Sequence, residues 1–264
     1  MANDESGGRG VVMETVGSLA GRVAIVTGGA RGIGAAVATA FVTQGASVVI
    51  TDVLDPEGKE LAHALGDTAR YIHLDVADSE AWRSAVAEAE ETFGPVSILV
   101  NNAGVVEFAS IEASSDATFR RVLDIDLVGA FFGMRTALPS MRRAGGGVIV
   151  NVSSTAGLIG YAGIAGYVAA KWGLRGLTKA AALEFAPDGI RVCSVHPGPI
   201  RTPMTAGMGE DSVVGQPIER FGEPDEVARM VVFIAAEATF STGSEFVLDG
   251  GATAGTVPVL PAGD

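Results

Sequence analysis

Residues Val23–Gly34 have the sequence VAIVTGGARGIG, and this stretch carries the strongest prediction about the architecture. Val23–Val26 are four consecutive apolar residues, as in a strand that is buried on both faces of a parallel sheet. Gly28, Gly32 and Gly34 then give a backbone that can approach a pyrophosphate closely, and the residues after them are typical of a helix. Because a helix N-terminus offers unpaired N–H groups and a positive dipole end, the stretch predicts a dinucleotide-binding strand, turn and helix.

A carboxylate follows the next predicted strand. Ser47–Thr51 are expected to form that strand, and Asp52 lies roughly 20 residues beyond the glycine turn, where an acid can accept hydrogen bonds from ribose hydroxyls. The same carboxylate would repel a 2′-phosphate, whereas Arg31 inside the turn carries a guanidinium, which suits phosphate. Because Asp52 stands where the ribose is bound, the sequence favours NAD over NADP as the cofactor.

Strand-like and helical stretches alternate along the chain. The strands are expected at residues 22–27, 47–51, 70–74, 97–101, 147–153, 191–196 and 245–249. This alternation predicts an α/β fold, a Rossmann-like doubly wound parallel sheet of about seven strands with helices on both faces. Residues 1–18 are polar and glycine-rich, so we expect a flexible N-terminal arm there and a single Rossmann-fold domain over residues 19–264.

A second motif, YVAAK, lies at residues 167–171. On a helix, Tyr167 and Lys171 are at positions i and i+4 and therefore lie on one face. A free phenol has a pKa of about 10, and a nearby ammonium favours the phenolate, which brings proton transfer at neutral pH within reach. The hydroxyl of Ser154 is a candidate for holding a substrate oxygen beside that phenol. These three side chains predict a site that moves a proton on or off an alcohol.

Five motifs appear in an order that resembles the short-chain dehydrogenase/reductase family, over residues 20–251. They are TGGARGIG at 27–34, NNAG at 101–104, Ser154, YVAAK at 167–171 and HPGPIRT at 196–202. Other runs are similar to bacterial 3α(or 20β)-hydroxysteroid dehydrogenases, namely TDVLDPEGKE at 51–60, RYIHLDV at 70–76, KWGLRGLTK at 171–179 and SVHPGPIRTPMT at 194–205. The resemblance implies reversible hydride transfer between NAD(H) and a secondary alcohol or ketone, with a hydroxysteroid or a similar bulky hydrophobic molecule as substrate.

The resemblance also implies a role for each matching residue. Tyr167 is expected to be the general acid/base, Ser154 to position the substrate oxygen, and Lys171 to bind the nicotinamide ribose and lower the pKa of the tyrosine. The expected catalytic set is Ser154, Tyr167, Lys171 and Asp126. The expected cofactor-binding residues are Gly28, Arg31, Gly32, Ile33, Gly34, Asp52, Asp75, Val76, Asn102, Gly104, Tyr167, Lys171, Pro197, Ile200 and Thr202.

Asp126, in the run LDIDLVGAF, departs from the family pattern, which usually has Asn at this position. In the family that Asn takes part in a proton relay through a bound water and the lysine, at a kink in its helix. An Asp is nearly the same size but cannot donate a hydrogen bond when it is ionised. We therefore expect activity that is reduced or that depends differently on pH.

Two helices and one loop are expected to shape the assembly and the substrate pocket. Residues 118–141 and 165–185 are expected to be helical, and the resemblance implies that they form a dimer interface within a homotetramer. Residues 203–217 combine glycines with Met204 and Met208, which favours a mobile loop that gives the substrate an adaptable apolar lining. An ordinary flexible surface loop is the alternative for this segment.

The composition argues against several functions. A formal charge of −13 argues against nucleic-acid binding, and no apolar run is long enough for a membrane span. The first residues lack the apolar core of a signal peptide, and the single cysteine, Cys193, suits a reducing cytoplasm. His63, His73 and His196 are scattered along the chain, so no metal site is expected.

Two other functions remain open. A 3-oxoacyl-carrier-protein reductase is the enzymatic alternative, but such an enzyme meets an acidic carrier and uses NADPH, and the acidic composition and Asp52 count against both. A nucleotide-binding sensor with little turnover is the non-enzymatic alternative. Asp126 favours the sensor, and the complete set of Ser154, Tyr167 and Lys171 argues against it.

Overall fold

The computed structural model describes residues 18–255 and contains one parallel sheet of seven strands. The strands are β1 (Val23–Thr27), β2 (Ser47–Asp52), β3 (Ala69–His73), β4 (Ile98–Asn101), β5 (Gly147–Val152), β6 (Ile190–Pro197) and β7 (Glu245–Leu248). Their order across the sheet is β3-β2-β1-β4-β5-β6-β7. The prediction of a Rossmann-like α/β fold is confirmed, and every strand end lies within one residue of its predicted position.

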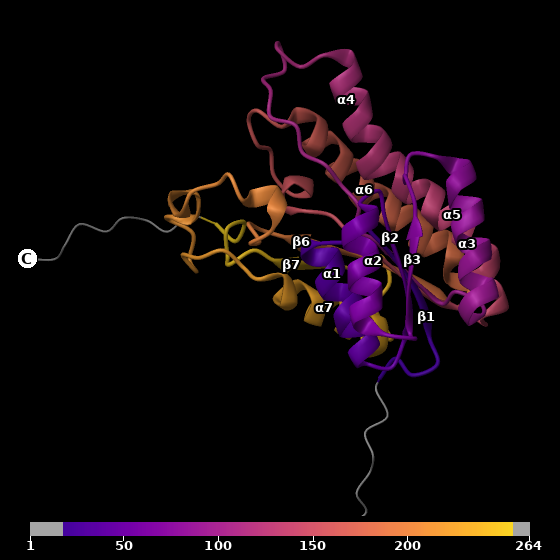
Figure 1. Ribbon diagram of the computed structural model, residues 1–264. Helices are drawn as coiled ribbons and strands as arrows, with labels where there is room; N and C mark the ends of the chain where they lie inside the picture. Colours follow the sequence, from indigo (N-terminus) through magenta and orange to yellow (C-terminus); the bar gives the residue numbers. More distant parts are fainter. Residues whose placement is uncertain (1–17, 256–264) are drawn as a thin grey trace, which may run out of the picture.

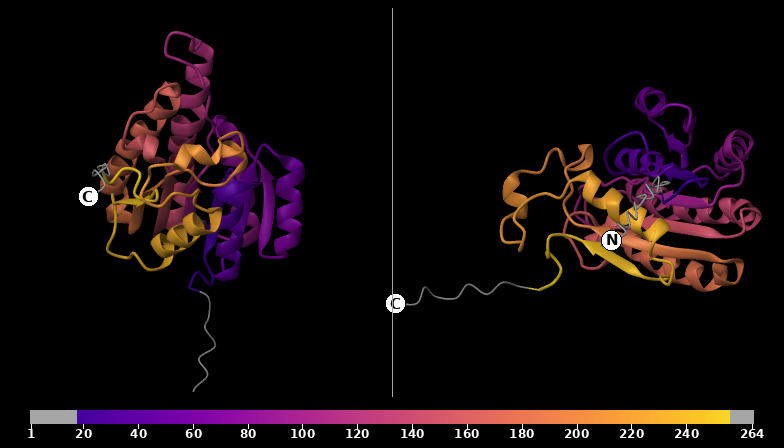
Figure 2. Two further views of the ribbon diagram at one scale, coloured as in Figure 1. Left: turned by 90° about the vertical axis from the view of Figure 1, so that its left-hand side faces the viewer. Right: turned by 90° about the horizontal axis from the view of Figure 1, so that it is seen from below.

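Helices cover both faces of the sheet (Figures 1 and 2). They are α1 (Gly32–Thr43), α2 (Asp55–Leu65), α3 (Ser79–Phe93), α4 (Asp116–Leu123), α5 (Gly129–Arg143), α6 (Ala165–Phe185) and α7 (Pro224–Ala236). One hydrophobic core joins the sheet to α1, α2 and α7, and a second core joins the opposite face to α3, α5 and α6. The segment between β6 and α7, orange in Figure 1, extends away from this layered body.

The chemistry of the strands explains their place in the sheet. All residues of β1 and β4 are buried, as continuous apolar runs require in the middle of a parallel sheet. The order of the strands reverses between β1 and β4, and in open α/β sheets ligands bind beyond the carboxyl ends of the strands at such a switch point. This edge is where the sequence predicted the cofactor.

The helix predicted over residues 118–141 is not one regular helix. A π-helical turn, Asp124–Val128, joins α4 to α5 without a break in the chain's helical path. A π turn holds one residue more than an α turn, and such turns are frequent at functional sites. Asp126 lies at its centre and is only 1% exposed, so the wider turn directs this carboxylate into the protein. The helix therefore departs from regular α geometry at the position where the family resemblance implied a kink.

Several polar side chains within the core form hydrogen bonds across neighbouring elements. Asn101 Nδ2 donates to Asn151 Oδ1 at 2.8 Å, and Asn151 Nδ2 donates to Thr178 Oγ1 at 2.9 Å, which links β4, β5 and α6. Cys193 is fully buried in β6, and its thiol donates to the carbonyl oxygen of Ser241 at 3.3 Å. Burial raises the pKa of the Cys193 thiol, which makes it unreactive.

The predicted loop over residues 203–217 is irregular apart from two short 3₁₀ turns, Pro203–Thr205 and Glu210–Val213. The predicted N-terminal arm, residues 1–18, falls outside the described residues except for its last position and stays a prediction. Among the helices of residues 18–255, none combines the length and the apolar character that crossing a bilayer requires.

Candidate active site

The glycine turn after β1 packs directly against the loop that follows β4. Asn102 Nδ2 donates to the carbonyl oxygens of Thr27 and Gly28 at 2.9 and 3.0 Å. Gly28 has a φ of +59°, and a Cβ atom there would lie 2.8 Å from the Cα of Ala103. This position therefore requires glycine for its backbone conformation and for the close approach of the neighbouring loop.

The first turn of α1 is open to an anion. α1 begins at Gly32 without an acidic residue in its first turn, and no side chain of the described residues caps it. By contrast, α3 is capped by Asp78, whose carboxylate accepts from two backbone N–H groups. The free N–H donors and the positive dipole end of α1 at Gly32, Ile33 and Gly34 therefore fit the pyrophosphate of a dinucleotide.

Asp52 is the last residue of β2, and its carboxylate joins the glycine turn to the turn after β2. Its Oδ2 accepts from the Ala30 N–H at 3.1 Å, and its Oδ1 accepts from the N–H groups of Val53 and Leu54 at 2.8 and 3.2 Å. Three backbone donors therefore hold the carboxylate in one place beside the turn. The side chain of Arg31, at the start of α1, is exposed to solvent.

Ser154, Tyr167 and Lys171 come from the end of β5 and from α6. Ser154 follows β5 and begins a short 3₁₀ turn, whereas Tyr167 and Lys171 lie one turn apart near the start of α6. The Nζ of Lys171 lies 5.3 Å from the centre of the Tyr167 ring and donates to the Val152 carbonyl oxygen at 3.1 Å. The predicted proximity of the phenol and the ammonium on one helix face is thus present.

The backbone of Ser154 is held by His196, a contact that the sequence did not predict. The Nδ1 of His196 lies 3.0 Å from the Ser154 carbonyl oxygen, and its Nε2 lies 2.9 Å from the Ser194 hydroxyl oxygen. Because a carbonyl oxygen only accepts, Nδ1 carries the proton and Nε2 accepts from Ser194. Burial lowers the pKa of His196, which favours this neutral form. The HPGPIRT motif contains this histidine, but neither spacing nor hydropathy indicates its partner.

Asp126 forms a buried ion pair with Lys171. Its Oδ2 lies 3.1 Å from the lysine Nζ, and its Oδ1 accepts from the Val105 N–H at 2.8 Å. The two charged side chains are 0% and 4% exposed, respectively. A Cβ atom at Gly104 would lie 2.7 Å from Asp126 Oδ2, so glycine at this position leaves room for the pair.

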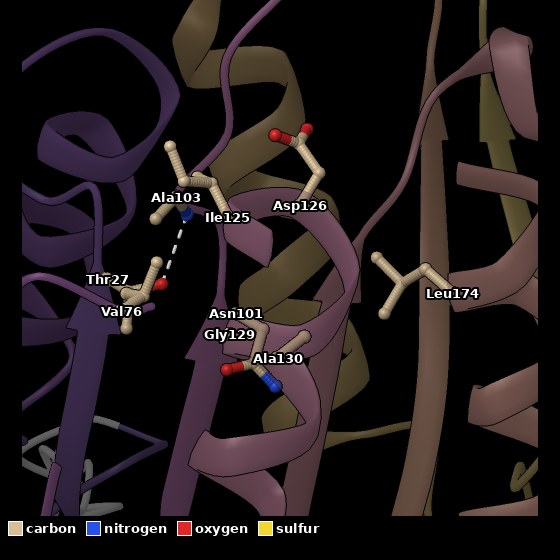
Figure 3. Close-up of a pocket in the computed structure, with 9 residues that line it drawn as sticks. All are labelled: Thr27, Val76, Asn101, Ala103, Ile125, Asp126, Gly129, Ala130 and Leu174. Carbon is tan, nitrogen blue, oxygen red and sulfur yellow. Dashed lines mark hydrogen bonds between the residues drawn. The ribbon is translucent and has the colours of Figure 1, made fainter. Parts of the chain in front are cut away.

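A small internal cavity lies beside this ion pair (Figure 3). It is lined by Thr27, Val76, Asn101, Ala103, Ile125, Asp126, Gly129, Ala130 and Leu174. Within residues 18–255, Asn101 Oδ1 and Asp126 Oδ2 are buried oxygens without a hydrogen-bond partner. The nearby ammonium of Lys171 therefore compensates the Asp126 charge mainly through electrostatic attraction, and loss of either charge would leave the other buried and uncompensated.

Burial dominates the protonation of the catalytic set. Burial raises the pKa of Tyr167, Lys171 lowers it, Asp126 raises it and hydrogen bonding with Ser154 lowers it, with a raised pKa as the outcome. Burial is the largest single influence on Lys171 and would lower its pKa, but the interactions with Asp126 and Tyr167 together outweigh burial, and the pKa is raised. Burial raises the pKa of Asp126, although Lys171 and the Val105 N–H act in the opposite direction. Lys171 therefore lowers the pKa of Tyr167, as expected, but in the protein without bound cofactor this effect is smaller than the effects that raise the pKa.

The remaining predicted cofactor residues lie along the same edge of the sheet. Asp75 and Val76 follow β3, and Pro197 is the last residue of β6. Ile200 and Thr202 lie in the loop after β6, which reaches the glycine turn, because a Cβ atom at Gly32 would lie 3.3 Å from Thr202 Cγ2. The loops after β1 to β6 and the start of α6 thus bring all the predicted positions to one edge of the sheet, from Asp52 to Ser154, Tyr167 and Lys171.

Comparison with known proteins agrees with this arrangement. Residues 28–253 match a family model described as Enoyl-(Acyl carrier protein) reductase. A 3-alpha-(or 20-beta)-hydroxysteroid dehydrogenase of Mycobacterium tuberculosis is 48% identical over 240 residues, which cover 90% of this chain and 92% of that protein. A trans-4-hydroxycyclohexanecarboxylate dehydrogenase of Sinomonas cyclohexanicum is 45% identical, with 90% and 95% covered. An NADP-dependent (R)-specific alcohol dehydrogenase of Lentilactobacillus kefiri is 40% identical, with 89% and 98% covered.

These relatives are dehydrogenases of small-molecule alcohols, and they match this chain across nearly its whole length. The match to the family model includes the glycine turn, Asp52, Asp126 and the Ser154, Tyr167 and Lys171 set. The chain therefore belongs to the short-chain dehydrogenase/reductase family and is an oxidoreductase that acts on CH–OH groups of secondary alcohols with a nicotinamide cofactor.

Proposed function

We propose that this enzyme interconverts a secondary alcohol and a ketone with NAD(H), and that its substrate is a hydroxysteroid or a similarly bulky hydrophobic molecule. The observation that carries the proposal is the convergence of Ser154, Tyr167 and Lys171 beside an open dinucleotide-binding turn. The names of the Mycobacterium tuberculosis and Sinomonas relatives support a cyclic secondary alcohol as substrate.

The position of Asp52 supports NAD as the preferred cofactor. Backbone N–H groups hold its carboxylate beside the glycine turn, where it is available to ribose hydroxyls and repels a 2′-phosphate. The kefiri relative is named as NADP-dependent, so cofactor choice varies among similar chains and has to come from local residues. The guanidinium of Arg31 suits a 2′-phosphate, but this side chain is exposed to water, so it does not need a phosphate partner.

The chain's own residues handle the proton and the geometry of the reaction. The nicotinamide supplies or accepts the hydride when it is bound. In oxidation, the Tyr167 oxygen takes the alcohol proton, and in reduction it returns that proton to the carbonyl oxygen. Ser154 hydrogen-bonds the same substrate oxygen, and Lys171 binds ribose hydroxyls while its ammonium favours the phenolate. Asp126 keeps the Lys171 ammonium charged and held, and opposes ionisation of the phenol.

Exposed apolar side chains next to the site support a bulky hydrophobic substrate. Ile159 and Tyr161 follow Ser154, and Met204 and Met208 lie in the loop over residues 203–217. Methionine adapts its shape to an irregular apolar surface, and substrate pockets are mostly apolar with a few polar anchors. We assign this loop the role of the substrate cover.

The assembly that we propose is a homotetramer built on α4, α5 and α6. Phe131, Trp172 and Leu183 are apolar side chains exposed on α5 and α6, as expected of helices that pack against a second copy.

We place the enzyme in the cytoplasm because its single cysteine is a free, buried thiol.

The test is a panel of steroid, terpenoid and acyl-thioester substrates, assayed by NADH and NADPH absorbance with the wild type and with Tyr167→Phe. We expect turnover of a bulky cyclic alcohol with NAD⁺, and a loss of about 10²- to 10⁴-fold in kcat for Tyr167→Phe with NADH binding retained. Unchanged turnover in Tyr167→Phe would remove the phenol from the chemistry. Turnover of acyl thioesters with NADPH alone would support the carrier-protein reductase, and dinucleotide binding without any turnover would support a sensor.

A further inference from the structure

Three side chains form a hydrogen-bonded cluster directly behind Asp52. The hydroxyl of Tyr71, on β3, donates to the Asp52 carbonyl oxygen and to Asp55 Oδ1, each at 2.7 Å. The Nδ1 of His73, also on β3, lies 2.6 Å from the same Asp55 oxygen. Asp55 is the first residue of α2, so the cluster joins the edge strand to the start of α2 and to the end of β2. The glycine turn and the catalytic set do not include any of these three residues.

The hydroxyl proton of Tyr71 is shared between two acceptors. The Asp52 carbonyl oxygen already accepts from the Leu74 N–H at 3.0 Å, so Tyr71 adds a side-chain donor to a backbone contact of the sheet. The Asp55 carboxylate accepts hydrogen bonds from His73 and from Tyr71, and these hydrogen bonds lower the pKa of its carboxyl group. Burial and the Asp55 charge raise the pKa of Tyr71, which keeps the phenol protonated as a donor.

The packing around the Tyr71 ring requires a glycine on α2. Gly58 is the buried fourth residue of α2, and a Cβ atom there would overlap the edge of the Tyr71 ring. Glycine inside a helix is less favourable than alanine by about 0.5–1 kcal/mol. A helix that carries this glycine therefore makes room for the ring, which places the hydroxyl between Asp52 and Asp55.

We propose that Tyr71 is a positioning residue for cofactor recognition, which acts by holding the Asp52 segment in place for the ribose of the dinucleotide. Asp52 Oδ1 accepts from the N–H groups of Val53 and Leu54, so the direction of its carboxylate depends on the backbone between β2 and α2. Tyr71 is bonded to both ends of that short segment, at the Asp52 carbonyl and at the Asp55 carboxylate. Without the hydroxyl, the Asp52 carbonyl oxygen still accepts from the Leu74 N–H, but the segment loses the hydrogen bonds from Tyr71 that join its two ends.

This inference rests on the proposed use of NAD(H) and adds a determinant that lies behind the binding surface. The residue touches the backbone of the ribose-binding acid, so it changes binding and discrimination and leaves proton transfer alone. The expected sign is weaker NADH binding and a smaller preference for NADH over NADPH, with kcat unchanged at saturating cofactor.

The experiment measures the Kd of NADH and NADPH by fluorescence titration for the wild type, Tyr71→Phe and Gly58→Ala, together with kcat and KM for NAD⁺. We expect Tyr71→Phe to bind NADH about 3- to 10-fold more weakly, because a single intramolecular hydrogen bond contributes that much. Gly58→Ala keeps the hydroxyl and improves the intrinsic helix propensity of α2, yet displaces the ring, so we expect weaker NADH binding from this variant as well. Asp52→Ala removes the carboxylate itself and therefore gives the largest expected loss of NADH affinity and of preference for NADH over NADPH.

Two matched controls separate positioning from a general loss of structure. Thr92→Val and Thr43→Val each remove a hydroxyl that bonds only along its own helix, to the carbonyl oxygens of Glu88 and Thr39. Both controls should bind NADH like the wild type. Tyr71→Phe and Gly58→Ala with wild-type Kd values and cofactor preference would overturn the role of Tyr71 and leave the proposed function standing. A wild type that binds neither dinucleotide would overturn both.

Discussion

Asp126 and Lys171 set the electrostatic balance around the phenol of Tyr167. A buried carboxylate and a buried ammonium 3.1 Å apart stabilise one another. Removal of either charge is strongly destabilising, because the other charge is then buried without a partner. The same carboxylate disfavours a second negative charge nearby, so it raises the pKa of Tyr167 while the ammonium lowers it. One residue that departs from the family pattern thus opposes ionisation of the phenol that we propose as the general base.

Replacement of Asp126 by Asn tests this balance directly. Asn keeps the size and an oxygen for the Val105 N–H but removes the negative charge, so the pKa of Tyr167 should fall in the pH range where the Lys171 ammonium stays protonated. Alcohol oxidation needs the phenolate, and it rises with pH through the phenol's pKa, so the rising limb of kcat against pH should move to lower pH. Rates measured with saturating NAD⁺ from about pH 6 to about pH 10 give the answer. An unshifted limb with an unchanged kcat would show that the substitution is silent.

At the scale of elements, the strands were predictable and the shape of one helix was not. The central strands β1 and β4 are short, mostly apolar runs, and burial in a parallel sheet imposes that pattern, whereas the edge strand β3 is only partly apolar and partly buried. No sequence pattern marks the π-helical turn at Asp124–Val128, and the hydrogen bond that Asp126 accepts from Val105 joins it to the loop after β4, which is distant in the chain. For this reason the sequence predicted Asp126 near Lys171 only through the family resemblance.

The partners of the site residues were also beyond sequence reasoning. The proximity of Tyr167 and Lys171 follows from their four-residue spacing on one helix, and this spacing can be read directly from the sequence. The contacts of His196 with Ser154 and of Tyr71 with Asp52 join residues that are distant in the chain, and only the sheet brings them together. A single sequence contains no spacing that encodes such pairs.

The tie between α6 and β7 predicts how stability depends on pH. Glu245 lies 2.8 Å from Arg175 and 2.6 Å from Lys179, and the hydrogen bond with Arg175, followed by that with Lys179, lowers the pKa of Glu245 to about 2. Because the folded pKa lies below the unfolded value, this stabilisation is complete above about pH 4.5 and is lost as pH falls toward about 2.

We therefore expect Glu245→Gln to lower the free energy of unfolding by about 1–2 kcal/mol near neutral pH, where the hydrogen-bonded charge pair is intact. The difference from the wild type should shrink at about pH 3.5, because protonation of Glu245 in the unfolded wild type has by then removed part of its advantage. Urea unfolding at both pH values measures it. A gap of equal size at the two pH values would mean that the charge of Glu245 does not contribute.

At the scale of the whole molecule, the distribution of exposed apolar side chains predicts assembly. Phe131, Trp172 and Leu183 lie on helices whose opposite sides already pack on the sheet, and Leu183 is 81% exposed. Burial of such side chains against a second copy is favourable, and a charge among them is not. Light scattering after size exclusion should therefore give about four times the 26.8 kDa of one chain. Trp172→Glu should give smaller species, whereas Ile111→Asp, in the loop before α4, should not. A monomeric wild type would contradict the proposed tetramer.

The isolation of Cys193 has a practical consequence. It is the only cysteine in the chain, it is fully buried in β6, and its raised pKa keeps it as a thiol. A cysteine placed at Ser212 or at another exposed position of the loop over residues 203–217 would carry a maleimide dye or a nitroxide without any removal of native thiols. Spectroscopy could then test, molecule by molecule, whether that loop opens and closes in an otherwise unaltered protein.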